Sequence, residues 1–478
     1  MTFATRIKNY VGEYAPLRHM RKEFWTTQAV TFVQAFSYFL FAQFFKIFLT
    51  QDCGFSAIEA GWTASFFATG MAIGLIIVGA LFDQIGCRKA TKLGSALVTV
   101  ARLGIGLMPL MLSAGTKPMK IAIIGMMAIA LVGEGIMGII PSAGTRLFSA
   151  EAIRPIAFNA WYLIMNVAGI LSGLVLEYLR NPDGGNSSVM FVVSATGFLG
   201  IIVARWYKDE TPEELTTKAD PSEKRKNFLT LLKEASTEST FWRLLLFLAV
   251  VIAIRGTFVL PMYLYPEYYM KVLGEDAHLG FLNSANPTVI VLGIFFLSPL
   301  IKRFNIYWTM VVGMFIATAS MFVMAVPPKW WISWGVASNG ENAYYLMILL
   351  QIVLYAVGEF IFSPQMQNYI TSIPPPEKVG TYSGLARLPD VAAKMIVTGA
   401  SGYLLTYYCT GTPQQFQNDL VEYGRSPEML NLLLALIVMT SPILCLIFKK
   451  TFYVEKKAEV GTGFLPNREN ARGKTYWT

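Results

Sequence analysis

Two glutamates lie inside long apolar runs of this sequence, each in nearly the same hexapeptide. Glu134 belongs to VGEGIM at residues 132–137, and Glu359 belongs to VGEFIF at residues 357–362. A carboxyl group that is shielded from water releases its proton less readily than an exposed one, so it can exchange a proton near neutral pH. Two chemistries suit such residues: carrying a proton and binding a positively charged group.

Five more charged residues fall inside predicted apolar segments: Arg102, Arg255, Arg387, Asp390 and Lys394. An ionised group at the centre of a membrane costs about 2.5–3.5 kcal/mol on insertion scales, so such groups usually face a cavity or one another. Together with the two glutamates they form a nearly balanced set of charges, which suits a zwitterion or an organic anion.

Three of these charges belong to one segment, YSGLARLPDVAAKMIVTG at residues 382–399. Arg387, Asp390 and Lys394 follow one another at intervals of three and four residues, so they share one helical face. Asp390 and Lys394 either neutralise each other or belong to a polar cavity face that includes Arg387. We favour the cavity face, because the pair would leave Arg387 without a counter-ion. Alternatively, Arg387 lies close to the cytoplasmic edge of the membrane and reaches water there.

The sequence that follows each glutamate predicts different roles for the two. Glu359 is followed by the cationic segment around Lys394, so we expect it to stay ionised and to bind substrate. The segment after Glu134, FNAWYLIMNVAGILSGLVL, carries no charge, so we expect Glu134 to carry protons. A second interpretation pairs either glutamate with Arg102 or Arg255 as a tether between helices.

The composition indicates a membrane protein. The chain has 478 residues, of which 54% are hydrophobic and 14% are charged, whereas a soluble domain carries about a quarter charged residues. Lys and Arg gather in alternate connecting segments, so the net charge of +9 reflects membrane orientation rather than nucleic-acid binding. We expect a polytopic protein surrounded by lipid, with no nucleic-acid partner.

Runs of about twenty apolar residues, each long enough to cross a bilayer as a helix, predict an all-α fold of two pseudo-symmetric six-helix bundles. The twelve expected transmembrane spans lie near residues 25–48, 60–82, 94–113, 120–142, 158–178, 188–206, 242–262, 281–300, 306–326, 344–366, 381–406 and 428–449. The expected domains are an N-terminal bundle (1–206), a linker (207–241), a C-terminal bundle (242–450) and a tail (451–478). Both termini and the linker are expected in the cytoplasm.

The sequence contains no pattern for ATP hydrolysis, metal binding or nucleophilic catalysis. Four cysteines are scattered without a CxxC pair, and the two histidines, His19 and His278, fall in expected loops. We therefore expect no metal, no cofactor and no enzymatic activity. A disulfide between Cys53 and Cys409 is the less favoured alternative to free thiols.

The segment GALFDQIGCRK, residues 79–89, resembles the signature loop of the major facilitator superfamily. The matching positions are Gly79, Asp83, Gly86, Arg88 and Lys89. Glycines at such positions permit a tight turn and close approach of helices. The resemblance implies the major facilitator fold, in which the aspartate helps to hold the two halves together in one conformation.

A second resemblance concerns the proton-coupled oligopeptide transporters, a branch of that superfamily. GEFIFSP, residues 358–364, looks like their tenth helix, which implies that Glu359 contacts the amino group of a substrate. FNAWYLIMNVAG, residues 158–169, is similar to their fifth-helix signature at Tyr162 and Asn166. NPTVIVLGIFFLSPL, which starts at Asn286, is similar to their eighth helix.

The first expected helix departs from the pattern of that branch. Thr31, Gln34 and Ala35 stand at the three positions where these transporters carry the charged residues used in proton coupling. The usual proton site is missing here, so we assign proton coupling to Glu134.

The sequence therefore predicts a secondary active transporter that works by alternating access as a proton symporter. Its substrate is expected to be a peptide, an amino-acid-like zwitterion or an organic anion. Expected partners are this small molecule, protons and membrane lipids, for a monomer of the plasma membrane or a bacterial inner membrane. The rival interpretation is a non-transporting receptor or assembly subunit on a transporter scaffold, which the internal charges disfavour. The expected substrate-binding residues are Glu359, Arg387, Lys394, Asp390, Arg255, Tyr162 and Asn166.

Overall fold

The computed structural model of the chain describes residues 11–150, 153–181, 183–208, 237, 239–297, 304–372 and 388–453. Arg387, most of the expected linker and the tail from residue 454 fall outside these ranges. The side chains of residues 72–84, Asp83 among them, fall outside as well. Predictions that depend on these residues stay predictions.

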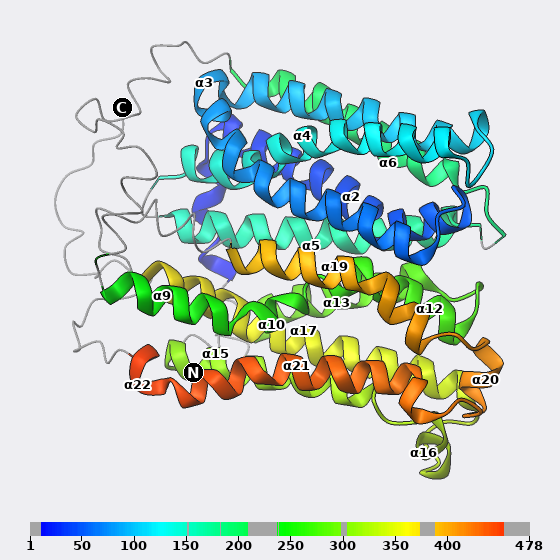
Figure 1. The fold of residues 1–478 in the computed structure, drawn as a ribbon. Helices are drawn as coiled ribbons and strands as arrows, with labels where there is room; N and C mark the ends of the chain where they lie inside the picture. The colour runs from blue at the N-terminus through cyan, green and yellow to red at the C-terminus, as the bar shows by residue number, and fades with distance from the viewer. Residues whose placement is uncertain are drawn as a thin grey trace.

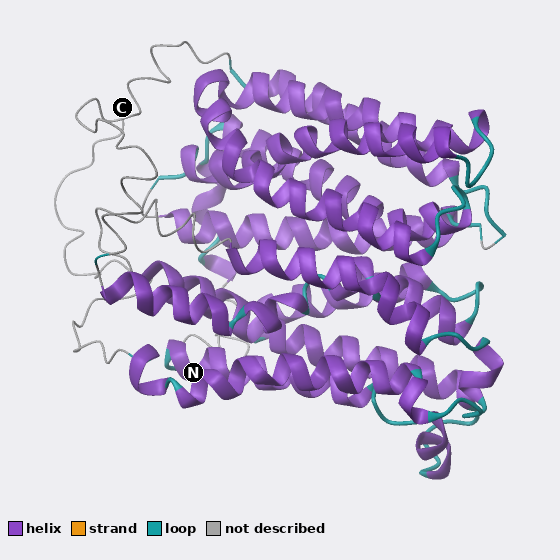
Figure 2. Cartoon of the chain, viewed as in Figure 1, coloured by secondary structure: helices purple, strands orange, loops and turns teal. Residues whose placement is uncertain are grey.

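The described residues form helices and loops and contain no strand (Figure 2). A short 3-10 helix, η1 (Ala15–His19), precedes the first long helix. The long helices of the first half are α2 (Lys22–Gln51), α3 (Ala57–Met111), α4 (Lys117–Leu147), α5 (Arg154–Leu179) and α6 (Ser187–Val203).

Helix α3 covers two expected spans, 60–82 and 94–113, with a break between them at Gly86. Gly86 has φ 73° and ψ 171°, a combination that residues with a side chain rarely adopt. The helix begins with a capping box, in which Ser56 and Glu59 exchange side-chain-to-backbone hydrogen bonds of 2.9 and 3.2 Å. The second glycine of the signature loop thus marks the junction between two membrane spans.

The second half has long helices and several short ones. The short elements are α10 (Ile252–Gly256), α11 (Leu260–Tyr263), α12 (Tyr265–Leu273), α16 (Pro328–Ser333), α20 (Pro413–Gln417) and α22 (Lys449–Phe452). The longer helices are α9 (Ser239–Val250), α13 (Leu279–Phe296), α15 (Ile306–Val323), α17 (Gly340–Ser372), α19 (Leu388–Tyr408) and α21 (Pro427–Ile447).

The prediction of a single straight helix over residues 242–262 is wrong. The chain bends by 51° between Phe241–Val250 and Ile252–Tyr263, and α12 then extends it to Leu273. Pro261 and Pro266 explain the interruptions beyond the bend, because proline cannot donate the helical hydrogen bond and its ring clashes with the preceding turn. The segment therefore reaches well beyond its expected end.

Nine helices of the described chain, or ten if the bent pair forms one span, are long and apolar enough to cross a membrane. The other two of the twelve expected spans coincide in position with the first part of α3 and with α19, which are not among those ten. The chain is thus a multi-pass helical membrane protein.

Helices of the first half lie together on one side of the molecule and helices of the second half on the other (Figure 1). Two helix pairs, α3 with α19 and α5 with α13, form the seam between the halves. Across this seam, the Ser284 hydroxyl donates to the Ile170 carbonyl at 3.0 Å, and the Ser65 hydroxyl donates to the Met395 carbonyl at 3.3 Å.

The loops divide between two ends of the helix bundle. We call the end that holds loops 52–56, 112–116, 180–186 and 274–278 the far side. Its loops are joined to one another, for example through the Gly115 N–H, which donates to the Cys53 carbonyl at 2.9 Å. The opposite end, where α2 begins and α21 ends, is the near side.

Candidate functional site

The two hexapeptides place their glutamates through close helix contacts. A Cβ atom built at Gly133 of α4 would lie 2.9 Å from the Val98 backbone nitrogen of α3, and one built at Gly358 of α17 would overlap the Ala317 backbone of α15. Only glycine permits such approaches. In both halves the fourth expected span packs on the third in the same way, which orients the glutamate that follows each glycine.

A cavity of about 470 Å³ lies between the two halves. Helices α2 and α5 line most of it from the first half, with Met71 of α3 and Gly138 of α4, and α10 to α13, α17 and α19 line it from the second. Its walls combine aromatic rings with charged and amide side chains. The charged and amide groups are Gln34, Gln43, Asn166, Arg255, Asn283, Asn286, Gln351, Glu359, Asp390 and Lys394.

Glu359 faces this cavity from α17. It is only 9% exposed, and its Oε2 accepts a hydrogen bond of 3.2 Å from the Asn286 amide of α13. No cation of the described chain forms an ion pair with it, so the carboxylate relies on two neutral groups, the Asn286 amide and the Tyr355 hydroxyl. A buried acidic group with so little compensation is suited to binding a cationic ligand group or a proton.

Arg255 and Asp390 form an ion pair at the cavity wall. The distance between Arg255 Nε and Asp390 Oδ1 is 3.2 Å, and the guanidinium carbon lies 5.3 Å from the Phe258 ring centre. The predicted alternative, in which Asp390 and Lys394 neutralise each other, is therefore wrong. Lys394 is half-buried and lines the cavity, and it makes no ion pair with any described residue.

Glu134 is placed differently from Glu359. It forms an ion pair with Arg102 of α3 inside the first half, and both side chains are 1% exposed. Arg102 also donates to the Ser37 hydroxyl and stacks on the Phe41 ring at 4.8 Å. Glu134 does not line the large cavity. The alternative of a tether with Arg102 is the arrangement present, and proton carriage by Glu134 stays a prediction.

A third internal ion pair escaped the sequence analysis. Lys46 Nζ of α2 lies 2.6 Å from Glu267 Oε2 of α12, with side-chain exposures of 3% and 8%. Lys46 also donates to the Ser401 hydroxyl of α19 at 3.1 Å. The three residues connect the first half to two elements of the second half near the far side. The signal available in the sequence was a lone lysine within the apolar run FLFAQFFKIFL.

The remaining predicted residues are distributed as follows. Tyr162 and Asn166 line the cavity, and the Asn166 amide donates to the Tyr162 carbonyl of its own helix at 2.8 Å. In the signature loop, Arg88 is half-buried and Lys89 is exposed, and both follow the Gly86 break. The placement of Arg387 and of the side chains at positions 79 and 83 lies outside the described residues.

The cysteines and histidines form no joint site in the described chain. Cys53 and Cys409 are buried and free, so the alternative of a disulfide between them is wrong. His278 caps the start of α13, and its Nδ1 lies 2.6 Å from Glu177 Oε1 of α5.

Residues 29–388 match the family model of the Major Facilitator Superfamily. The chain belongs to this superfamily. That membership explains the helix pairs that meet at a central cavity and the glycine break in the signature loop. Among curated protein sequences no match was found.

Solved structures with the same fold include two transporters of the POT family and a nucleoside transporter. A POT family transporter in complex with a thioalcohol-conjugated peptide has a TM-score of 0.66 at 14% identity, covering 90% of this chain and 96% of that one. The POT family transporter PepTSo has a TM-score of 0.67 at 13% identity, with 90% and 98% covered. A mutant of the nucleoside transporter NupG has a TM-score of 0.66 at 10% identity, with 90% and 100% covered.

Proposed function

We propose that this chain is a secondary active transporter that moves a small polar organic solute by alternating access between two six-helix bundles. The observation that carries the proposal is the cavity between the halves, which is lined by charged groups that are costly to keep inside a membrane. Structural relatives that transport peptides or nucleosides support the same interpretation. A receptor or assembly subunit would have no need, at one cavity, for a weakly compensated Glu359 and for a Lys394 that forms no ion pair with the described residues.

The substrate that fits these walls carries an amine and an acidic group. Glu359 provides the site for the amine, and Lys394 provides a cation without a counter-ion in the described chain for the acidic group. Arg255, paired with Asp390 at the same wall, adds a second positive charge to the cavity. An amino-acid-like zwitterion, a short peptide or an organic anion meets these requirements.

We infer that the seam and the buried Lys46–Glu267 pair close the cavity toward the far side. The Lys and Arg bias of the sequence assigns the near side, with both termini, to the cytoplasm. We therefore infer a conformation closed to the outside. The proposed location is the plasma membrane or a bacterial inner membrane, with the chain acting as a monomer.

We propose proton coupling as the energy source. Glu134 is the carrier expected from the sequence, but its partner Arg102 favours the ionised carboxylate and holds it away from the cavity. Glu267 is the alternative carrier, because it is paired across the two halves and loss of its charge would release Lys46 and loosen the contact between them. Symport of a proton would then be linked directly to opening of the far side.

Reconstituted vesicles test the function. Uptake of dipeptides, amino acids, organic acids and nucleosides is measured with and without an inward pH gradient. Accumulation of at least one solute above its external concentration, dependent on the gradient, is the expected result. Uptake that never exceeds that of protein-free vesicles for any solute class would favour the receptor interpretation.

A further inference from the structure

The two ends of the cavity differ in chemistry. On α17 the residues Gln351, Tyr355, Glu359 and Ser363 follow one another at intervals of four and all line the cavity, as one face of a helix requires. Gln351 lies closer to the far side than Glu359 by two helical turns, which corresponds to roughly 12 Å of helix. On this helix the charged group therefore lies toward the near side of the cavity and the amide of Gln351 toward the far side.

Two more amides accompany Gln351 in this part of the cavity. Gln43 lies three residues before Lys46 on α2, and Asn283 lies one turn closer to the far side than Asn286 on α13. Exposed fractions are 8% for Gln43, 8% for Asn283 and 3% for Gln351. We call these three residues the amide cluster.

Each amide of the cluster has one buried polar atom without a hydrogen-bond partner in the described chain. Gln43 Oε1, Gln351 Oε1 and Asn283 Nδ2 are buried without one, and the Tyr263 hydroxyl, also at the cavity wall, is in the same condition. A buried polar group left in this state costs about 1–3 kcal/mol, so native proteins rarely retain it without a ligand or water to satisfy it. Four such groups on one cavity point to a bound molecule that both donates and accepts hydrogen bonds.

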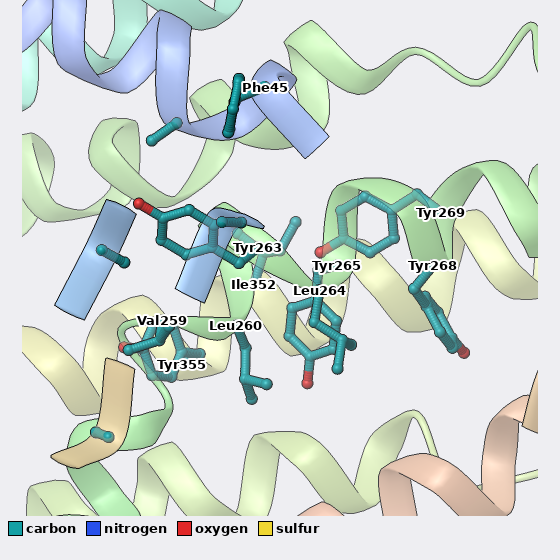
Figure 3. Close-up of a cluster of buried hydrophobic side chains, with 14 of the residues drawn as sticks. Phe45, Val259, Leu260, Tyr263, Leu264, Tyr265, Tyr268, Tyr269, Ile352 and Tyr355 are labelled. Carbon is teal, nitrogen blue, oxygen red and sulfur yellow. The ribbon is translucent and has the colours of Figure 1, made fainter. Parts of the chain in front are cut away.

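Aromatic rings surround this end of the cavity. Tyr265 and Tyr269 of α12 stack with ring centres 5.8 Å apart and an interplanar angle of 19°. Figure 3 shows the hydroxyls of Tyr263 and Tyr355 pointing in the same direction, whereas the Tyr268 side chain points the opposite way. Flat apolar faces beside unsatisfied amides suit a planar polar group such as a carboxamide.

A charged group is excluded from this end because the described chain offers it no free counter-ion. Lys46 and Glu267 already neutralise each other there, and the amide cluster is uncharged. A buried charge without a partner is more costly than a neutral hydrogen-bonding group.

We propose that the amide cluster is a subsite for an uncharged group that donates and accepts hydrogen bonds, carried on the same solute whose charged end lies at Glu359 and Lys394. The subsite rests on the proposed transport function and narrows its substrate class. The solute is a zwitterion about 12 Å long with a carboxamide or hydroxyl-bearing group at one end.

Binding of three matched probes to the purified full chain tests the proposal. Alanyl-glutamine has a neutral amide side chain, alanyl-glutamate a charged one and alanyl-methionine an apolar one of similar length. We expect alanyl-glutamine to bind about tenfold more tightly than the other two, the size of one or two buried hydrogen bonds. Gln351→Met and Gln43→Met are each expected to remove most of that preference, measured as the ratio of alanyl-glutamine to alanyl-methionine affinity.

A matched control uses a glutamine that lies elsewhere. Gln28 of α2 is buried, donates to the Thr145 hydroxyl at 3.1 Å and does not line the cavity, so Gln28→Met is expected to keep the preference.

Uridine serves as a hydroxyl-bearing probe. If Gln351→Met and Gln43→Met weaken the binding of uridine selectively, the natural ligand carries a hydroxyl group at the subsite instead of an amide. Binding of the dipeptides and of uridine with no amide preference and no effect of either variant overturns the subsite but not transport. Binding of no probe, together with absent vesicle uptake, overturns both.

Discussion

Lys46 of α2 and Glu267 of α12 form a buried ion pair across the two halves of the molecule, with 2.6 Å between Nζ and Oε2. The hydroxyl of Ser401 on α19 completes the contact at 3.1 Å from the same nitrogen. Neither charge reaches water in this conformation. Any conformation in which the far side opens must separate them or hydrate them, so the pair acts as a latch for the closed state.

Neutralising one member of this latch should favour opening of the far side. Glu267→Gln leaves Lys46 buried without a counter-ion, and the loss of one partner of a buried pair costs about 3–5 kcal/mol. Only the closed conformation bears that cost, so the equilibrium shifts toward the open one. The measurement uses Met165→Cys, a cavity position, in a chain without native cysteines. An impermeant thiol reagent is added from the far side, and the rate of labelling is compared between the parent and Glu267→Gln chains.

Controls separate the latch from general damage. The exchanged pair Lys46→Glu with Glu267→Lys should return labelling toward that of the parent chain. Lys120→Ala removes an ion pair with Glu59 that lies within the first half, so it should leave labelling unchanged. Equal labelling of the parent and Glu267→Gln chains would contradict the latch.

Glu359→Gln tests the amine site. A hydrogen bond between charged groups contributes about 1.5–3 kcal/mol, so the concentration of an amine-bearing solute that gives half-maximal uptake should rise at least about tenfold. The same solute with an acetylated amine should be unaffected. Glu428→Gln is the matched control, since Glu428 is a buried carboxylate of α21 that accepts a hydrogen bond from Tyr344 away from the cavity. Equal loss in both variants would make Glu359 a structural residue.

Asp390→Asn tests the cavity cations. It removes the carboxylate that pairs with Arg255 and so raises the net charge of the cavity wall by one. We expect the ratio of anionic to zwitterionic uptake to increase several-fold, because a more positive cavity wall attracts an anionic solute. Asp419→Asn, which breaks an ion pair with Lys329 on the far side, should leave the ratio unchanged. A ratio that does not move in Asp390→Asn would indicate that Arg255 has no access to the solute.

The sequence predicted the all-helical membrane fold and the cavity position of Glu359 because both depend on local patterns. Apolar runs specify a membrane helix whatever its neighbours are, and the paired hexapeptides mark equivalent helix contacts at Gly133 and Gly358. The partners of the charges depend on tertiary packing instead. Nothing in the spacing of Asp390 and Lys394 indicates that Arg255, far away in the chain, lies closer to the aspartate.

The latch was missed for two physical reasons. Lys46 lies among phenylalanines in the first span, so its charge is hidden by the mean apolarity of that segment. Glu267 follows Pro266, beyond the point where the seventh span was expected to end. Because the chain bends instead of stopping, α12 continues toward the far side and brings Glu267 back to α2.

Cys53 should be unreactive in the folded protein. Burial raises the pKa of its thiol to about 12, and the nearby Asp52 carboxylate adds to the shift. The reactive thiolate is therefore scarce at about pH 8. This pKa lies above the usual thiol value of about 8.5. The contribution of the protonated Cys53 thiol to the free energy of unfolding is therefore fully present below about pH 8.5. It is lost as the pH rises through the folded pKa.

Maleimide labelling at about pH 8 checks this expectation, because only the thiolate reacts. A chain that keeps Cys53 as its single cysteine should label only after denaturation. Ser113→Cys in a cysteine-free chain offers a matched, more accessible thiol on the same side and should label at once. Comparable rates for the two thiols would mean that the loop around Cys53 opens readily.

The last prediction concerns Glu134, for which proton carriage and a structural tether give different outcomes. Glu134→Gln leaves Arg102 without its counter-ion at a site where both side chains are 1% exposed. The loss of one partner should lower the free energy of unfolding by about 3–5 kcal/mol, whereas replacing both members with apolar residues can be neutral. The double variant Arg102→Met with Glu134→Met should therefore recover much of the thermal stability in detergent. If Glu134 also carries the proton, that stable double variant will exchange internal for external substrate but will not accumulate it in response to a pH gradient. Gradient-driven accumulation in the double variant would restrict Glu134 to the tether and leave proton coupling to Glu267.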